Sequence, residues 1–226
     1  MELQWTELKD SFIYKEEKGM GGVFSIDGKG FRFLSTMSEL VTLNLLWLLC
    51  CIPIVTIGAS TAALYTITIK MVKNEDSYVI RGFFSSFKQN FKQATTIWMI
   101  LLAAAAVLFF DFYFSSYAPV KGAAVLFVPF ATAAALLVLV MIYVFPIQAV
   151  FKNTVWKTLK NSLYMALAYL PLSILAFVIA MGPLAVIFLF LDHFGSALFF
   201  NCVIGFAFFT WTNSHIFVKV FDRYMV

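Results

Sequence analysis

The sequence predicts an all-α protein: a polytopic helical membrane bundle of five to six transmembrane helices, with a broken or hairpin first segment and amphipathic cytoplasmic elbows. Two measures of composition and one pattern predict this class. Hydrophobic residues make up 62% of the 226 residues and charged residues only 12%, whereas soluble domains are roughly 45–50% apolar and about 25% charged. The mean hydropathy is +0.90. Between Leu34 and Val218 the few charges fall at intervals that suit several membrane spans.

The chain divides into a polar N-terminal segment, residues 1–33, and a helical transmembrane domain, residues 34–226. The first segment mixes acidic and basic residues and lacks an early apolar stretch with a small-residue cleavage site, so we expect no secretory signal. Its Trp and Phe side chains are of the kind that lie at a membrane interface. We therefore expect an amphipathic approach to the membrane.

The first apolar tract, residues 34–69, is too long for one crossing, because about 36 residues of helix would reach about 54 Å. Pro53 lacks a backbone donor and Gly58 relieves steric limits, and both residues therefore predict a helix break. The tract predicts a helical hairpin. Its second arm, residues 59–72, is short and either crosses the membrane or is re-entrant.

Four further apolar tracts predict spans, which brings the total to five, or to six if the second arm crosses: residues 94–114, 123–145, 163–191 and 197–218. Lys and Arg gather in the connection 70–92 and again in 152–160, whereas the connection 115–122 holds only Lys121. The positive-inside rule therefore predicts that the two basic connections and the C-terminus are cytoplasmic. Six spans also place the N-terminus there, and five place it outside.

Both basic connections combine aromatic residues at helical spacing with lysines, which is typical of an amphipathic elbow that leads into a span. One interpretation is that the elbows anchor in anionic headgroups. The other is that they dock a cytoplasmic partner. The docking candidates are Phe84, Phe87, Lys88, Asn90, Phe91, Lys92, Trp156, Lys157 and Lys160.

Polar residues inside the apolar tracts are the other candidates, because an unpaired polar group in hydrocarbon is costly. The first interpretation is hydrogen bonding between helices, and the alternative is a substrate or proton path. These candidates are Glu39, Asn44, Thr56, Thr61, Asp111 and Asn201.

Catalytic and nucleic-acid functions find no support in the sequence. It has no zinc-ligand spacing, phosphate-binding loop or nucleophile triad, so we expect no enzyme activity, no metal site and no cofactor. The net charge of +4 is too weak and too dispersed for a nucleic-acid surface.

Several motifs resemble the YesL-like family of bacterial integral membrane proteins. They are residues 44–47 (NLLW), 52–59 (IPIVTIGA), 63–65 (ALY), 83–91 (FFSSFKQNF) and 160–162 (KNS). The resemblance implies a multi-pass protein of the bacterial cytoplasmic (inner) membrane, without an established activity or catalytic residues. It also implies a role in carbohydrate import, because family members are often encoded beside sugar-uptake ABC transporters and polysaccharide-degrading enzymes.

These observations favour an accessory or assembly subunit associated with carbohydrate ABC import. Such a subunit would have no ATPase activity of its own, since a phosphate-binding loop is missing from the sequence. Its expected partners are the lipid bilayer and the permease or binding-protein subunits of a sugar importer. The alternative is a small autonomous transporter that forms a homo-oligomer, with Asn44, Thr56 and Thr61 beside the helix break lining its site. A membrane enzyme would need acidic or His side chains to converge in the fold.

Overall fold

In the computed structural model, residues 29–75, 78–117 and 123–224 are described, and most of them are helical. The chain forms two compact units, residues 1–41 and 42–226, and helix α2 begins in the first and ends in the second. No strand occurs in these ranges, which confirms the all-α class. The elements are α2 (Lys29–Cys51), η1 (Ile54–Thr56), α3 (Ile57–Val72), α4 (Val79–Tyr117), α5 (Ala123–Val150), α6 (Val155–Ala168), α7 (Leu170–Ala180), α8 (Gly182–Leu189), η2 (Leu191–His193), α9 (Phe194–Phe200), η3 (Asn201–Gly205) and α10 (Phe206–Phe221).

Five stretches of helix are long and apolar enough to cross a membrane: Arg32–Cys51, Ile54–Val72, Val79–Phe114, Val128–Val150 and Leu191–Phe221. Helices α6 and α7 add a sixth if they count as one span, although they meet at an angle of 106°. The predicted helical bundle of five to six spans is therefore confirmed by length and composition. Most of the predicted polar segment, residues 1–28, lies outside the described residues.

The predicted break in the first apolar tract lies at Pro53, which precedes the short 3-10 turn η1 in extended conformation. Gly58 lies inside the first turn of α3 rather than in the break. A Cβ atom at this position would lie only 2.6 Å from the Cβ of Trp98 and 2.7 Å from the carbonyl oxygen of Ala94. Gly58 therefore serves the close approach of α3 to α4, as small residues do between membrane helices.

The backbone groups that this break frees are bonded within the protein. The Thr56 hydroxyl lies 2.6 Å from the carbonyl oxygen of Cys50 and 2.7 Å from that of Pro53. The indole N–H of Trp98 donates to the carbonyl oxygen of Ile54 at 2.8 Å. Such partners allow an interrupted helix to exist at membrane depth.

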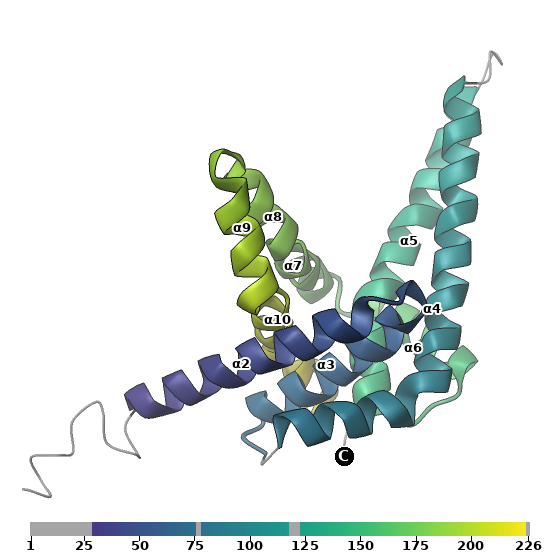
Figure 1. Ribbon diagram of the computed structural model, residues 1–226. Helices are drawn as coiled ribbons and strands as arrows, with labels where there is room; N and C mark the ends of the chain where they lie inside the picture. Colours follow the sequence, from purple (N-terminus) through teal and green to yellow (C-terminus); the bar gives the residue numbers. More distant parts are fainter. Residues whose placement is uncertain (1–28, 76–77, 118–122, 225–226) are drawn as a thin grey trace, which may run out of the picture. The chain divides into compact units, whose positions relative to one another are not determined.

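Helix α4 joins the first predicted elbow and the following span in one continuous helix of 39 residues. Its first part lies across the base of the second unit, and the remainder rises away from that base (Figure 1). The predicted amphipathic helix that leads into a span is therefore present. Helix α5 returns beside the rising part of α4 and contains Pro129 and Pro146 within its length.

The predicted span 163–191 consists of several helices separated by breaks. The chain turns by 106° at Tyr169 between α6 and α7, and a second interruption at Met181 separates α7 from α8. Pro171 and Pro183 begin the two new helices, because proline fits the first turn of a helix but not its interior. The Ser173 hydroxyl lies 2.8 Å from the carbonyl oxygen of Ala166 and donates to the backbone near the bend.

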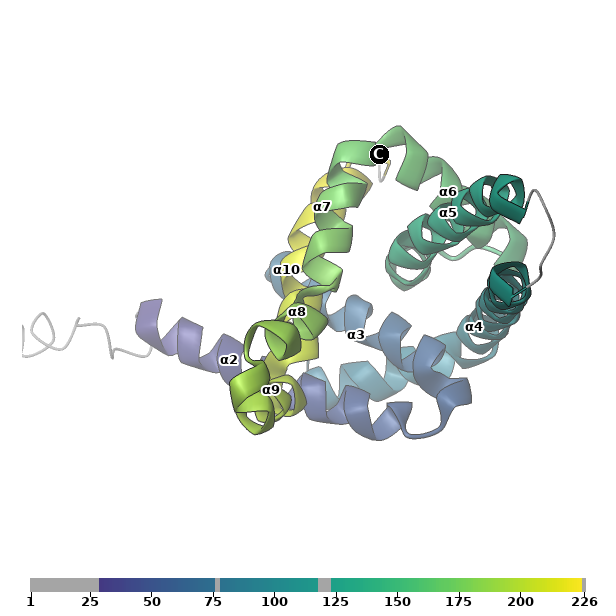
Figure 2. The ribbon, with the colours of Figure 1, turned by 90° about the horizontal axis from the view of Figure 1, so that it is seen from above.

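The core of the second unit lies around α3, which stands between α4 and α10 (Figure 2). The ring of Phe217 on α10 contacts Tyr143 and Tyr65, with ring centroids 5.2 Å and 5.7 Å apart. The hydroxyls of Thr68 and Ser214 form a buried hydrogen bond of 2.8 Å between α3 and α10. These contacts fix the positions of α3, α5 and α10 relative to one another.

Candidate functional site

The first candidate surface consists of the two elbow helices, the beginning of α4 and the helix α6. On α4, Phe84 is 48% exposed and Lys88 and Lys92 are exposed, while Phe87 packs partly against the core. Phe87 and Phe91 contact each other with ring centroids 5.5 Å apart. The elbow thus presents lysines and aromatic rings together outside the core.

Helix α6 is held beside the α4 elbow by a hydrogen-bonded side chain. The Gln93 amide donates to the carbonyl oxygen of Asn153 at 2.7 Å and lies 3.3 Å from the Thr158 hydroxyl. On α6, Trp156 is 75% exposed and Lys157 is exposed. We give the name elbow surface to six of the exposed residues on these two helices: Phe84, Lys88, Phe91, Lys92, Trp156 and Lys157.

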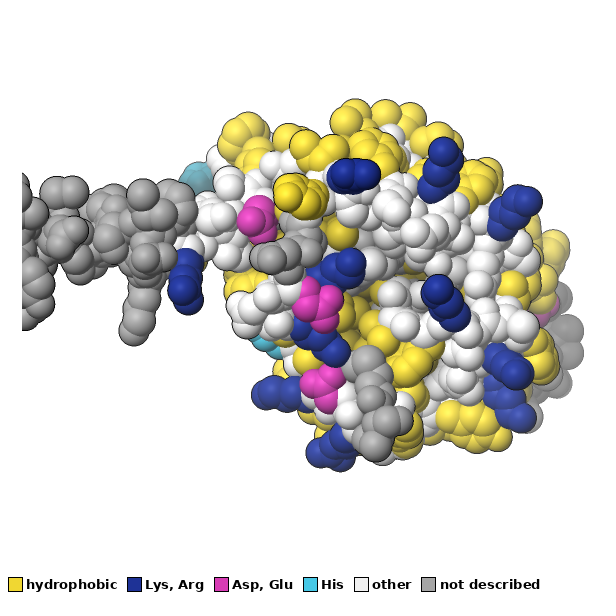
Figure 3. All heavy atoms as spheres, turned by 90° about the horizontal axis from the view of Figure 1, so that it is seen from below, with side chains coloured by type: hydrophobic (Ala, Val, Ile, Leu, Met, Phe, Trp, Pro, Cys, Tyr) yellow, Lys and Arg dark blue, Asp and Glu magenta, His cyan; other side chains and the backbone are white. Residues whose placement is uncertain are grey.

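The remaining docking candidates take other positions. Asn90 is half-buried and its amide donates to the Ser86 hydroxyl at 3.2 Å, so it serves the local structure of α4. Lys160 is exposed, and its ammonium lies 5.7 Å from the centre of the Tyr164 ring. Seen from below, the second unit carries Lys and Arg side chains spread among hydrophobic ones (Figure 3). This face combines charge and apolar area.

Asn44, on the part of α2 that belongs to the second unit, is fully buried and forms three of the four hydrogen bonds that its amide can make. Its amide nitrogen donates to the carbonyl oxygens of Asn201 at 3.0 Å and Cys202 at 2.7 Å. Its oxygen accepts the backbone N–H of Ala207 at 2.9 Å. The π-helix η3 displaces backbone groups from the usual α-helical pairing. Asn44 supplies partners for three of them.

Two further polar candidates of the second unit, Asn201 and Thr61, also form hydrogen bonds within the protein, while the side-chain oxygen of Asn201 is buried without a partner among the described residues. The amide nitrogen of Asn201 donates to the carbonyl oxygens of Pro183 and Ala197, at 3.2 Å and 3.0 Å. The Thr61 hydroxyl accepts the indole N–H of Trp47 at 3.2 Å. We call Asn44, Asn201 and the segment Asn201–Gly205 the polar junction. Its bonds agree with the packing interpretation of the intramembrane polar residues.

Two acidic candidates lie apart from the polar junction in the sequence. Glu39, in the first unit, accepts a hydrogen bond of 3.4 Å from the Ser35 hydroxyl one turn earlier. Asp111 is half-buried near the end of α4. Within the described residues, no group of three or more His, Cys, Asp or Glu side chains is arranged to hold a metal ion.

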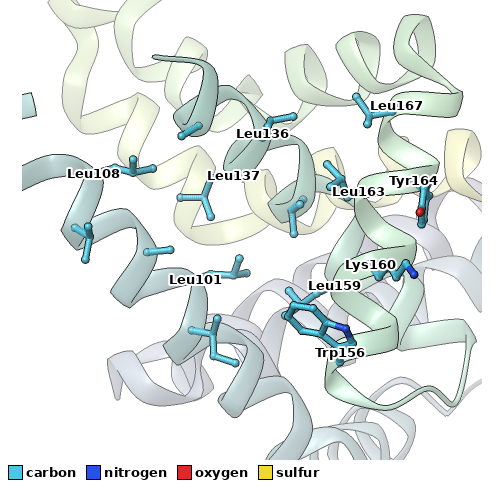
Figure 4. A pocket seen from close by; sticks show the side chains of 15 residues that line it. Leu101, Leu108, Leu136, Leu137, Trp156, Leu159, Lys160, Leu163, Tyr164 and Leu167 are labelled. Atoms are coloured by element: carbon cyan, nitrogen blue, oxygen red, sulfur yellow. The ribbon is translucent and has the colours of Figure 1, made fainter. Parts of the chain in front are cut away.

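An apolar groove of about 850 Å³ lies between α4, α5 and α6. Figure 4 shows its lining, with Trp156 and Leu101 toward one end and Leu108 and Leu136 toward the other. Lys160 is the one charged residue in the lining. The groove residues are Ile100, Leu101, Ala104, Val107, Leu108, Ala133, Leu136, Leu137, Val140, Trp156, Leu159, Lys160, Leu163, Tyr164 and Leu167.

Sequence reasoning selected Trp156 and Lys160 but not the groove to which they belong. The α4 and α5 residues of the lining are ordinary residues of apolar helices, and similar residues elsewhere in the chain lie in the core or on the surface. A signal was present in the small side chains Ala104 and Ala133, which leave space where larger residues would fill it. That signal can be interpreted only when the helix pairing is known.

The fold and these surfaces define a multi-pass helical membrane protein. Residues 40–112 match the family described as "Protein of unknown function, DUF624". Over 174 residues the chain is 28% identical to "Uncharacterized protein YesL" of Bacillus subtilis (strain 168), a match that covers 75% of this chain and 80% of that protein. Both matches support the resemblance to the YesL-like family that the motifs predicted. No solved structure gives a significant match.

Proposed function

We propose that the protein is an accessory or assembly subunit of a carbohydrate ABC importer, and that it binds the importer's permease subunit through the elbow surface. The observation that carries this proposal is the elbow surface itself. Phe84, Phe91 and Trp156 expose aromatic area beside the lysines of the same two helices. Exposed aromatic residues are enriched where proteins bind each other, and nearby charges select and orient the partner.

Charge complementarity identifies the side of the partner that the elbow surface would bind. Lys88, Lys92 and Lys157 have no carboxylate within salt-bridge distance among the described residues. They lie in the basic connections that the positive-inside rule assigns to the cytoplasm. The expected partner surface is therefore an acidic, partly apolar cytoplasmic segment of the permease. The assignment to a sugar importer rests on the family resemblance. The proposed role is binding and assembly and requires no enzymatic reaction.

The transporter alternative has less support from the geometry. It assigns a substrate site to Asn44, Thr56 and Thr61, and each of these side chains bonds to groups of this protein. The large groove is lined almost entirely by apolar side chains, whereas a sugar needs several convergent hydrogen-bonding groups. If the following experiment finds no importer subunit, the hypothesis of a homo-oligomeric transporter gains support.

The test is affinity purification of the full chain from its native membrane in mild detergent, with co-purifying proteins quantified by mass spectrometry. We expect permease subunits in near-stoichiometric yield. The double variant Lys88→Glu/Lys92→Glu should lower that yield about tenfold or more, because like charges then face each other across the interface. The control Lys152→Glu/Lys219→Glu makes the same charge change at exposed sites outside the elbow surface and should retain the permease.

Three results would contradict the proposal. The first is wild-type protein recovered alone or as a homo-oligomer, and the second is equal permease recovery with both double variants. The third is an elbow variant that no longer inserts in the membrane, which would support headgroup anchoring instead. Capture of an unrelated protein does not count as support.

A further inference from the structure

We propose that the groove between α4, α5 and α6 binds one anionic phospholipid, with its acyl chains in the groove and its phosphate at Lys160. This site shares Trp156 with the elbow surface that carries the proposed function, and its other lining residues lie outside that surface. The groove volume of about 850 Å³ falls within the range of roughly 300–1,000 Å³ that is common for ligand sites. The occupant follows from the depth of the groove and from the distribution of charge in its lining.

The depth of the groove suits one leaflet rather than a whole bilayer. Along α4 the lining runs from Ile100 to Leu108, which corresponds to a helical rise of about 12 Å. One leaflet contributes about 15 Å of the roughly 30 Å hydrocarbon core. A transmembrane helix of a partner protein would run the full core and extend well beyond this groove. An acyl chain that begins at the headgroup level spans one leaflet only and therefore matches the depth of the groove.

The charge lies where a headgroup would need it. Lys160, the only charged residue of the lining, lies on α6, which directly follows the basic connection after α5. Its ammonium lies near the Tyr164 ring, and no carboxylate of the described residues lies within salt-bridge distance of it. An ammonium in this setting attracts a lipid phosphate, and it favours an anionic lipid because a zwitterionic headgroup carries its own cation beside the phosphate.

Aromatic residues complete the headgroup end. Trp156 and Tyr164 both line the groove on the same helix as Lys160 (Figure 4). Trp and Tyr are the residues that mark the headgroup level in membrane proteins, because their rings are apolar at one end and polar at the other. The indole N–H of Trp156 forms no hydrogen bond within the described residues, which leaves it available as a second donor to the phosphate.

Native mass spectrometry of the full chain in mild detergent tests the site with two lipids of identical acyl chains, phosphatidylglycerol and phosphatidylcholine. We expect one tightly retained phosphatidylglycerol and weaker retention of phosphatidylcholine. Lys160→Gln should lower the affinity for phosphatidylglycerol roughly tenfold, the effect of one charge-assisted hydrogen bond. Lys157→Gln removes the same charge from the same helix outside the groove and should change the affinity less than about twofold.

A second variant tests the acyl part of the site. Ala104→Phe places a ring in the groove and should reduce retention of both lipids, while thermal unfolding checks that the variant is folded. Equal binding of the two lipids, or equal losses from Lys160→Gln and Lys157→Gln, would overturn the headgroup assignment. A photo-crosslinking side chain at position 163 that captures a protein segment instead of lipid in the native membrane would overturn the choice of occupant.

Discussion

The polar junction and the groove differ in the polarity of their side chains and in whether those side chains have partners within the protein. At the polar junction, the fully buried Asn44 forms three hydrogen bonds within the protein. In the groove, fourteen of the fifteen lining residues are uncharged and mostly apolar, and the only cation, Lys160, has no carboxylate partner among the described residues. The buried Asn44 therefore serves the fold, whereas the apolar hollow with one charge offers room for a ligand.

This difference has a physical cause. Inside a membrane, a broken or widened helix frees backbone groups that water cannot reach, so side chains such as Asn44, Thr56 and Ser173 must bond to them. An apolar hollow carries no such cost, because lipid chains can fill it. A polar residue in an apolar tract is therefore a weaker sign of a substrate site here than a gap between helices.

The largest expected effect concerns the polar junction. Asn44→Leu removes all three hydrogen bonds and leaves two carbonyls and one N–H of the α9–α10 region unpaired. We expect the free energy of unfolding to fall by about 2–3 kcal/mol, since each unpaired buried group costs about 1–3 kcal/mol and membrane reference states recover part of that. Reversible unfolding in mixed micelles measures the change.

Gln89→Leu is the control for this variant, because Gln89 is an exposed amide on α4 and its replacement should change stability by less than about 0.5 kcal/mol. If Asn44→Leu is as stable as the wild type but loses binding of a sugar, the packing interpretation of Asn44 fails. The transporter alternative would then regain support.

An intermediate effect compares two alanines of the same helix. Ala94 is fully buried where α4 meets α3, and Ala104 lines the groove. Ala94→Leu should cost about 1–3 kcal/mol by overpacking, whereas Ala104→Leu should change stability by less than about 0.5 kcal/mol because space is available. Thermal unfolding in detergent checks both variants. Equal losses would mean that the groove closes in the membrane.

The sequence predicted the class of fold, the break at Pro53 and the α4 elbow because each depends on local composition or on a single residue type. The bend at Tyr169 was not predicted, because a proline such as Pro171 in an apolar tract is compatible with a kinked span as well as with a new helix. The partners of Asn44 lie more than 150 residues away in the chain, so no local pattern reveals them. The groove likewise depends on how three helices pair.

The smallest expected change in the free energy of unfolding concerns the contact between α3 and α10. One buried and one exposed polar contact join these two helices. Lys73 and Asp222 form an ion pair of 3.0 Å in which the two side chains are 25% and 54% exposed. Asp222→Asn should lower the free energy of unfolding by less than about 1 kcal/mol, and less still at high salt, because solvent and ions screen the pair. Thr68→Val, which removes the hydroxyl that Thr68 contributes to the buried bond with Ser214, should cost about 1 kcal/mol at any salt concentration. A salt-independent loss for Asp222→Asn that equals the Thr68→Val loss would show that the end of α10 is shielded from water and belongs to the packed core.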